Sequence, residues 1–208
     1  MEQRLMKESC EHFSELLSAK VSVPGGGGAA AYVGALAAAL CSMTGQFTVG
    51  KKKYAAYEED LQRLLAECDS LRRDLLQLVE EDAAAFEPLS KAYAIPKDDP
   101  SRAQILEEAT KAAAQAPLSM MRTICRVIDA LCEMQQKGSV MLMSDVACGA
   151  TLAGAALQCA ALNVYINTKS LMDREHAFAL EKEADVMQAT YLARSAKITE
   201  EITVAMRS

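Results

Sequence analysis

Two long stretches without any charged residue constrain this fold more than any other feature. Residues 29–47 and 146–168 contain no Asp, Glu, Lys or Arg, and both are rich in Ala and Gly. Stretches of this length can span a bilayer, but Ala contributes little to membrane insertion. We therefore expect two helices that are covered by other helices or by a partner subunit, in a protein that does not span a membrane.

The rest of the chain also favours helix. Hydrophobic residues make up 51% of the sequence, and they are mainly Ala, Leu, Val and Met, of which Ala and Leu are strong helix formers. Apolar residues recur at helical spacing. The pattern predicts helices over residues 2–19, 56–91, 99–137, 145–166 and 171–205.

The third of these helices carries its own start and stop signals. Asp99 is the expected N-cap and Pro100 the first helical position, and Gly138 is the expected C-cap. Pro117 should kink or divide the helix. With no internal repeat or linker, we predict an all-α, single-domain helical bundle over residues 1–208, with two central uncharged helices.

Charge and cysteine usage exclude several classes of protein. The formal net charge is −6, which argues against general nucleic-acid binding. The seven Cys include no C-x-x-C pair, and there are only two His, so we expect no metal site. Scattered thiols and a polar N-terminus, Met1-Glu2-Gln3-Arg4, which starts a helix rather than a signal peptide, predict a cytoplasmic protein.

Four consecutive glycines, residues 25–28, precede the first uncharged helix. Such a run loses much conformational entropy on folding, so the backbone there needs unusual dihedral angles or a close approach. Free N–H groups at the start of a helix suit an anion. A tight bend that lets helices cross closely explains the glycines equally well, and both readings remain open.

Asp82 is the single residue that the sequence singles out most clearly as a candidate catalytic group. It follows an apolar seam, spaced by three and four residues, that Phe86 and Leu89 continue. Burial should raise the pKa of a carboxyl there, and such a group can give and take a proton near neutral pH. The alternative is a salt-bridged or capping Asp at the edge of the core.

Three other groups of polar residues are candidates for ligand contact. Lys51, Lys52 and Lys53 could meet an anionic ligand or form a solvated helix end. Asp145, with Ser144, either belongs to a site or caps the helix that follows. Asn163 and Asn167 share a face of that helix and could bind the backbone or a heterocycle.

Several motifs together resemble the formiminotransferase-cyclodeaminase family. They are Ser22-Val-Pro-Gly-Gly-Gly-Gly-Ala-Ala-Ala, Thr48-Val-Gly-Lys-Lys-Lys-Tyr54, Glu81-Asp-Ala-Ala-Ala-Phe86, Ala116-Pro-Leu118, Ser144-Asp145 and Leu162-Asn-Val-Tyr-Ile-Asn-Thr-Lys-Ser-Leu171. The chain departs from the family at Gly28, where Ser is common, and at Tyr165, where a basic residue is common. We expect no formiminotransferase domain in this sequence.

The resemblance implies an all-α enzyme that acts on tetrahydrofolate carrying a one-carbon group. It implies Asp82 as the acid/base and no prosthetic group. The residues that we expect to bind substrate are Pro24, Gly25, Gly26, Gly27, Lys51, Lys52, Lys53, Phe86, Ser144, Asp145, Asn163, Asn167 and Lys169.

The expected reaction is cyclisation of 5-formimidoyltetrahydrofolate to 5,10-methenyltetrahydrofolate with release of ammonia. Hydrolysis of the methenyl compound to 10-formyltetrahydrofolate is the first alternative. A non-catalytic helical assembly protein is the second, but it has no reason to keep an acid on an apolar seam. The expected partners are a reduced folate, including polyglutamated forms, and a second copy of the chain in a homodimer formed through the uncharged helices.

Overall fold

The computed structural model describes residues 4–208, so the expectation that Met1–Gln3 begin a helix lies outside the described residues. In the described part, seven α-helices and three 3₁₀ helices account for all regular structure. The 3₁₀ helices are η1 (Leu5–Lys7), η2 (Lys52–Tyr57) and η3 (Val140–Leu142). The α-helices are α1 (Cys10–Ser18), α2 (Gly26–Gln46), α3 (Glu58–Tyr93), α4 (Arg102–Ala113), α5 (Gln115–Lys137), α6 (Met143–Thr168) and α7 (Arg174–Arg207).

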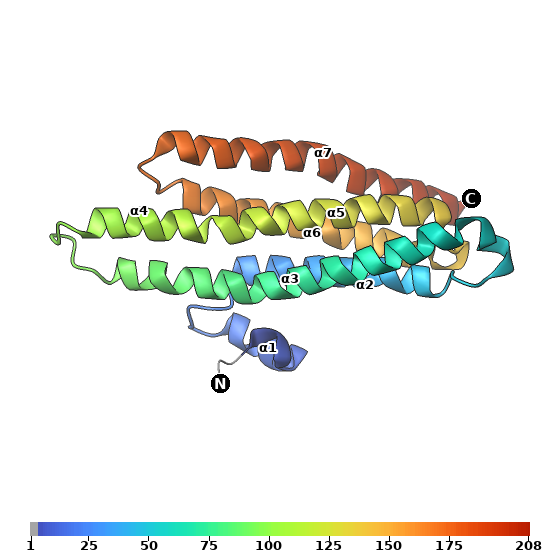
Figure 1. The fold of residues 1–208 in the computed structure, drawn as a ribbon, viewed down its shortest axis with the longest axis horizontal. Coiled ribbons are helices and arrows are strands. Elements are labelled where there is room, and N and C mark those ends of the chain that lie inside the picture. Colours follow the sequence, from blue (N-terminus) through green and yellow to red (C-terminus); the bar gives the residue numbers. More distant parts are fainter. Residues whose placement is uncertain (1–3) are drawn as a thin grey trace.

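The long helices lie side by side along one axis, and the short α1 packs on their flank (Figure 1). Helix α5 contacts α2, α3, α6 and α7, while α2 and α6 run antiparallel against each other. Apolar residues from these five helices form one continuous core. The predicted all-α bundle is confirmed.

The two uncharged helices are only partly covered within one chain. Most of their small residues are buried, but Leu36 of α2 and both Leu162 and Ile166 of α6 are exposed. By length and composition, α2 and the stretch Val140–Thr168 would each be able to cross a membrane. In this fold both pack lengthwise into the bundle, and each leaves one uncharged stripe uncovered.

Two predicted helix starts are wrong, because hydrogen bonds close to each start determine the residue at which the helix begins. Within the expected helix 2–19, a 3₁₀ turn comes first and α1 begins only after Ser9, whose Oγ accepts the N–H of His12. Asp99 does not cap α4, because its carboxylate accepts the N–H and hydroxyl of Ser101 and holds a turn before Arg102.

The other boundaries follow the prediction closely. The chain bends at Ala114, between α4 and α5, which places Pro117 in the first turn of α5 where its missing N–H is tolerated. Gly138 is the C-cap of α5, as predicted.

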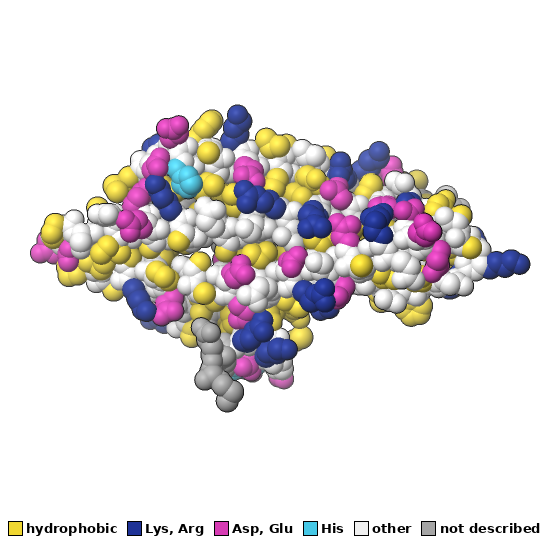
Figure 2. All heavy atoms as spheres, viewed as in Figure 1, with side chains coloured by type: hydrophobic (Ala, Val, Ile, Leu, Met, Phe, Trp, Pro, Cys, Tyr) yellow, Lys and Arg dark blue, Asp and Glu magenta, His cyan; other side chains and the backbone are white. Residues whose placement is uncertain are grey.

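The face drawn in Figure 2 carries charges of both signs, interspersed along the bundle. Some charged residues of the described chain pair across helices, as Arg122 of α5 does with Glu183 of α7, and Lys137 of α5 with Asp60 of α3. No continuous basic patch is visible on this face (Figure 2).

Candidate active site

The first turn of α2 lies between Asp82 of α3 and Asn163 of α6. A Cβ atom added at Gly27 would lie 2.5 Å from Oδ1 of Asp82, and one added at Gly26 would lie 3.4 Å from Nδ2 of Asn163. Three helices far apart in the sequence therefore bring a carboxyl group and an amide group to one glycine-rich helix end. Pro24, just before this end, is buried, and Gly25 is the N-cap.

Close approach, rather than an unusual dihedral angle, explains the glycine at position 27. Among residues 4–208, the only glycine with positive φ is Gly50, at the other end of α2. The backbone at Gly25 is extended, with φ −123° and ψ −160°, which any residue adopts. The constraint comes from the carboxyl group of Asp82, which lies against Gly27.

Burial raises the pKa of the Asp82 carboxyl above its ordinary value, and the backbone N–H of Gly28, which donates to it, partly opposes the rise. The seam residues that precede Asp82 in α3, from Leu61 to Leu78, are buried as predicted. Within the described chain no salt bridge to Asp82 is recorded, so the salt-bridged form of the alternative does not hold. The N–H of Gly28, in the first turn of α2, donates to the carboxyl group, so Asp82 caps α2 from the neighbouring helix, as the capping form of the alternative expects. The carboxylate thus occupies the positive end of α2, which suits an anion.

The side chains of Asn163 and Asn167 make different hydrogen bonds. Nδ2 of Asn163 donates to the carbonyl of Cys159, one turn earlier in α6. Nδ2 of Asn167 donates to the carbonyl of Asn163 and reaches that of Ala113, at the junction of α4 and α5. Asn163 thus faces α2, whereas Asn167 ties α6 to its neighbours.

Two more expected site residues lie at this end of the bundle. Phe86 is half-buried, and its ring packs against a small apolar cluster between α3 and α4 that includes Leu89 and Leu106. Lys169 is exposed at the C-cap of α6. Phe86 lies one turn after Asp82 in α3, whereas Lys169 follows the last turn of α6.

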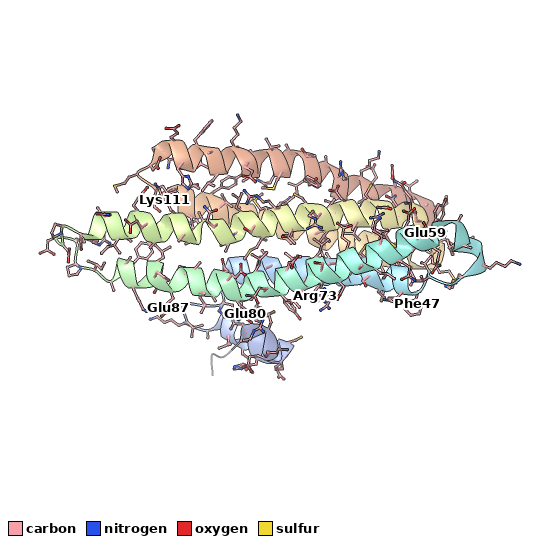
Figure 3. The ribbon with its side chains drawn as sticks, in the orientation of Figure 1. Phe47, Glu59, Arg73, Glu80, Glu87 and Lys111 are labelled. Carbon is pink, nitrogen blue, oxygen red and sulfur yellow. The ribbon has the colours of Figure 1, made fainter. Side chains whose placement is uncertain are left out.

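The remaining expected residues lie at the opposite end of the bundle. Lys51, Lys52 and Lys53 follow α2, whose 21 residues separate them from Gly25 by roughly 30 Å. Ser144 and Asp145 begin α6 beside them. Figure 3 shows this separation, since Glu80 and Glu87, which flank Asp82 along α3, lie far from Phe47 and Glu59 at the other end.

A shallow apolar groove of about 290 Å³ runs between α2 and α6 from the Asp82 end. It opens at Gly26 and Asn163 and continues between Val33 of α2 and Ala155 of α6. The groove therefore connects the candidate site with the uncovered stripes of the two uncharged helices.

Comparison with known proteins identifies the family and agrees with the all-α fold. The model of the formiminotransferase-cyclodeaminase family matches residues 9–186. This chain belongs to that family. A methenyltetrahydrofolate cyclohydrolase from Methylorubrum extorquens is 39% identical over 199 residues, which cover 94% of this chain and 96% of the relative.

Other family members extend the match. The formimidoyltransferase-cyclodeaminase of Mus musculus is 34% identical over 83% of this chain, which spans only 32% of that longer protein. A formiminotetrahydrofolate cyclodeaminase structure from Thermotoga maritima superposes with a TM-score of 0.84 at 29% identity, covering 96% of this chain and 99% of that one. This member of the formiminotransferase-cyclodeaminase family is thus a folate one-carbon enzyme of the cyclodeaminase or cyclohydrolase class, rather than an assembly protein alone.

The two departures from the family pattern have different structural settings. A Cβ at Gly28 would make only ordinary contacts, 3.5 Å from Val79 and 3.6 Å from Pro24, so glycine is not required there. Tyr165 faces α7, where its hydroxyl donates to Asp185 and accepts from Gln188. Burial, and then the bond to Asp185, raise the pKa of Tyr165 to about 12.

The structure corrects the expectation for Asp145 and gives a structural role to one further residue, Tyr54. Asp145 does not cap α6, because Leu142 is the N-cap and Asp145 lies in the first turn. Tyr54, which the motif contains but the reading left without a role, accepts the N–H of Val140 at 3.1 Å. This bond is the main cause that lowers the pKa of Tyr54. It ties the lysine segment to the start of α6.

Among residues 4–208, no three His, Cys, Asp or Glu side chains converge to hold a metal ion. All seven cysteines are free thiols, and Cys41, Cys68 and Cys125 are buried. The groups that the structure brings together at this helix end are a carboxyl group, an amide group and the amino end of α2.

Proposed function

We propose that the site around Asp82 binds a tetrahydrofolate derivative whose one-carbon unit is carried on N5 or bridges N5 and N10. In this proposal Asp82 is the acid/base, and the enzyme needs no prosthetic group. The observation that carries the proposal is the partly buried Asp82 carboxyl, whose pKa is raised by burial while it lies against the amino end of α2. A carboxyl group whose pKa is raised in this way is suited to give and take a proton.

Both family reactions use a group of this kind. In cyclodeamination, N10 attacks the formimidoyl carbon on N5, the proton of N10 passes to the imine nitrogen, and the resulting amino group leaves as ammonia after it receives a second proton. In hydrolysis, water adds to the methenyl carbon and loses one proton to give a carbinol. The carbinol O–H then loses its proton as the bond from carbon to N5 breaks, and N5 takes up a proton, which leaves the 10-formyl compound. The methenyl group is cationic, so a carboxylate beside it also stabilises it electrostatically.

We place the hydrolysis of 5,10-methenyltetrahydrofolate first and cyclodeamination second. The relative named a cyclohydrolase is the more similar in sequence, at 39% identity over nearly its whole length. Cyclodeamination, the reaction that the sequence alone led us to expect, is supported by the structural neighbour named a cyclodeaminase, at 29% identity.

We further propose that two copies of the chain form a two-fold dimer through α2 and α6. The exposed stripes of these helices carry no charge and include Leu36, Leu162 and Ile166. A two-fold axis perpendicular to the helices would bring the lysines of one copy toward the Asp82 end of the other. Such a dimer would unite the two groups of expected site residues and give the lysines an anionic folate tail to bind.

One experiment separates the two reactions. The purified protein is offered 5-formimidoyltetrahydrofolate and 5,10-methenyltetrahydrofolate in turn, and the absorbance of the methenyl chromophore is followed. Disappearance of the chromophore in the second assay, faster than without protein, supports the cyclohydrolase, and its appearance in the first supports the cyclodeaminase. Failure to turn over either compound, together with failure to bind a reduced folate, would overturn the proposal.

A further inference from the structure

The four glycines before α2 differ in what a side chain at each would meet. A Cβ at Gly25 would have nothing within 4 Å, and one at Gly28 would make only ordinary contacts. A Cβ at Gly26 would approach Asn163 to 3.4 Å, at the edge of an ordinary contact. A Cβ at Gly27 would lie 2.5 Å and 2.7 Å from the two carboxylate oxygens of Asp82 and 2.8 Å from its Cγ.

We propose that Gly27 is a positioning residue for Asp82: its lack of a side chain lets the carboxyl group lie against the first turn of α2, where the N–H of Gly28 holds it. The consequence for catalysis rests on the proposed function, whereas the packing relationship does not. This role replaces the expectation that Gly27 contacts the substrate.

An added methyl group at position 27 requires either the carboxyl group of Asp82 or one of the two helices to move. All three carboxyl atoms lie under 3.0 Å from the Cβ position, so rotation of the carboxyl about its own axis relieves nothing. Gly27 is buried in α2, and Val79, one turn before Asp82, is fully buried in α3, so the two backbones are held by the core. An alanine at position 27 must therefore displace the carboxyl group from the N–H of Gly28 or separate the helices.

The packing is tested by thermal unfolding of a set of variants. Gly27→Ala should lower Tm by roughly 3–10 °C, the usual effect of overpacking in a chain of this size. The matched control Gly28→Ala, in the same helix turn, should leave Tm unchanged or raise it, because alanine favours helix. In an Asp82→Ala background, Gly27→Ala should no longer lower Tm.

If Gly27→Ala still lowers Tm in the Asp82→Ala background, the proposal is overturned. A Gly27→Ala variant as stable as wild type would also overturn it. If Gly27→Ala alone does not fold, the double variant should fold. A double variant that also fails to fold counts against the proposal.

The catalytic consequence is tested in the wild-type reaction, once turnover of either folate is seen. Gly27→Ala should lower kcat by about tenfold or more, as misplacement of a general acid/base does, and change KM little. It should also displace the limb of the pH profile that Asp82→Asn removes. Reduced stability alone would not move that limb, so an unchanged kcat and limb would sink the positioning role. If the wild type turns over neither folate, the proposed function fails, while the Tm series still decides the packing.

Discussion

The side-chain amide of Asn163 donates to the carbonyl of Cys159, 2.8 Å away and one turn earlier in α6. This bond fixes the orientation of the amide group of Asn163. Because Nδ2 is the donor of the bond, Oδ1 is the atom that remains to accept a hydrogen bond. Within residues 4–208 no donor to that oxygen is recorded, and the amide faces Gly26 across from Asp82. An acceptor there is suited to an N–H group of a pterin ring.

Asn163→Ala should therefore weaken substrate binding without unfolding the protein. Loss of one uncharged hydrogen bond costs about 0.5–1.5 kcal/mol, so KM or Kd for the reduced folate should rise by roughly two- to tenfold. Calorimetric titration with the folate and a thermal unfolding curve measure the two quantities. An unchanged Kd with a lowered Tm would show that the amide only ties α6 together.

Asp82→Asn should keep the fold and the binding of reduced folate but lose most of the turnover. Asn is nearly the same shape, and the change removes a partly buried ionisable group rather than adding one. Loss of a general acid/base lowers kcat by roughly two to four orders of magnitude. Steady-state kinetics across pH should show a wild-type limb, displaced upward from that of an exposed Asp, which the variant lacks. Normal turnover in the variant would make Asp82 a structural acid.

The free energy of unfolding should depend on pH through the same carboxyl group of Asp82. The pKa of Asp82 is raised in the folded state, so the folded protein holds this proton more tightly than the unfolded chain, whose Asp pKa is about 3.9. The contribution of Asp82 to the free energy of unfolding should fall as pH rises from that value through the folded pKa. Wild type and Asp82→Asn, unfolded with urea at a series of pH values, should differ increasingly in favour of the variant over this window. A difference that does not change with pH would contradict the raised pKa.

Replacing Lys51, Lys52 and Lys53 with Gln should weaken folate binding, more for polyglutamated than for monoglutamate forms. All three lysines are exposed, so any attraction to an anionic tail is screened by salt. Affinity measured at low and high ionic strength should converge between wild type and variant as salt increases. Unchanged affinity with unchanged salt dependence would leave the lysines as a solvated segment after α2.

A charge placed on the uncovered stripe of α6 should dissociate the proposed dimer. Leu162 and Phe178 are both 65% exposed, but only Leu162 lies on the face shared with α2. Leu162→Glu should sediment as a monomer at micromolar concentration, because it would bury a charge between the copies. The matched control Phe178→Glu, on α7, should remain a dimer. A wild type that is a stable monomer would refute the dimer itself.

The periodicity of the sequence was enough to place most helices and the seam of α3. Residues such as Leu61, Leu71 and Leu78 are buried where steps of three and four put them, and this same spacing singled out Asp82. Helix ends were less certain, since Ser9 and Asp99 decide them through single hydrogen bonds to nearby N–H groups. These bonds depend on local geometry that composition does not reveal.

What the sequence alone determined is therefore the all-α class, the uncharged pair of helices and the acid on an apolar seam, because each depends on the periodic exposure of side chains along a single helix. Only the tertiary structure decided that Gly27 lies against Asp82, and that Asn163 of α6 lies beside Gly26. The physical reason is that both facts depend on how separate helices pack. The contacts of α2 with α3 and α6 are set by the whole core, which the pattern of a single helix does not describe.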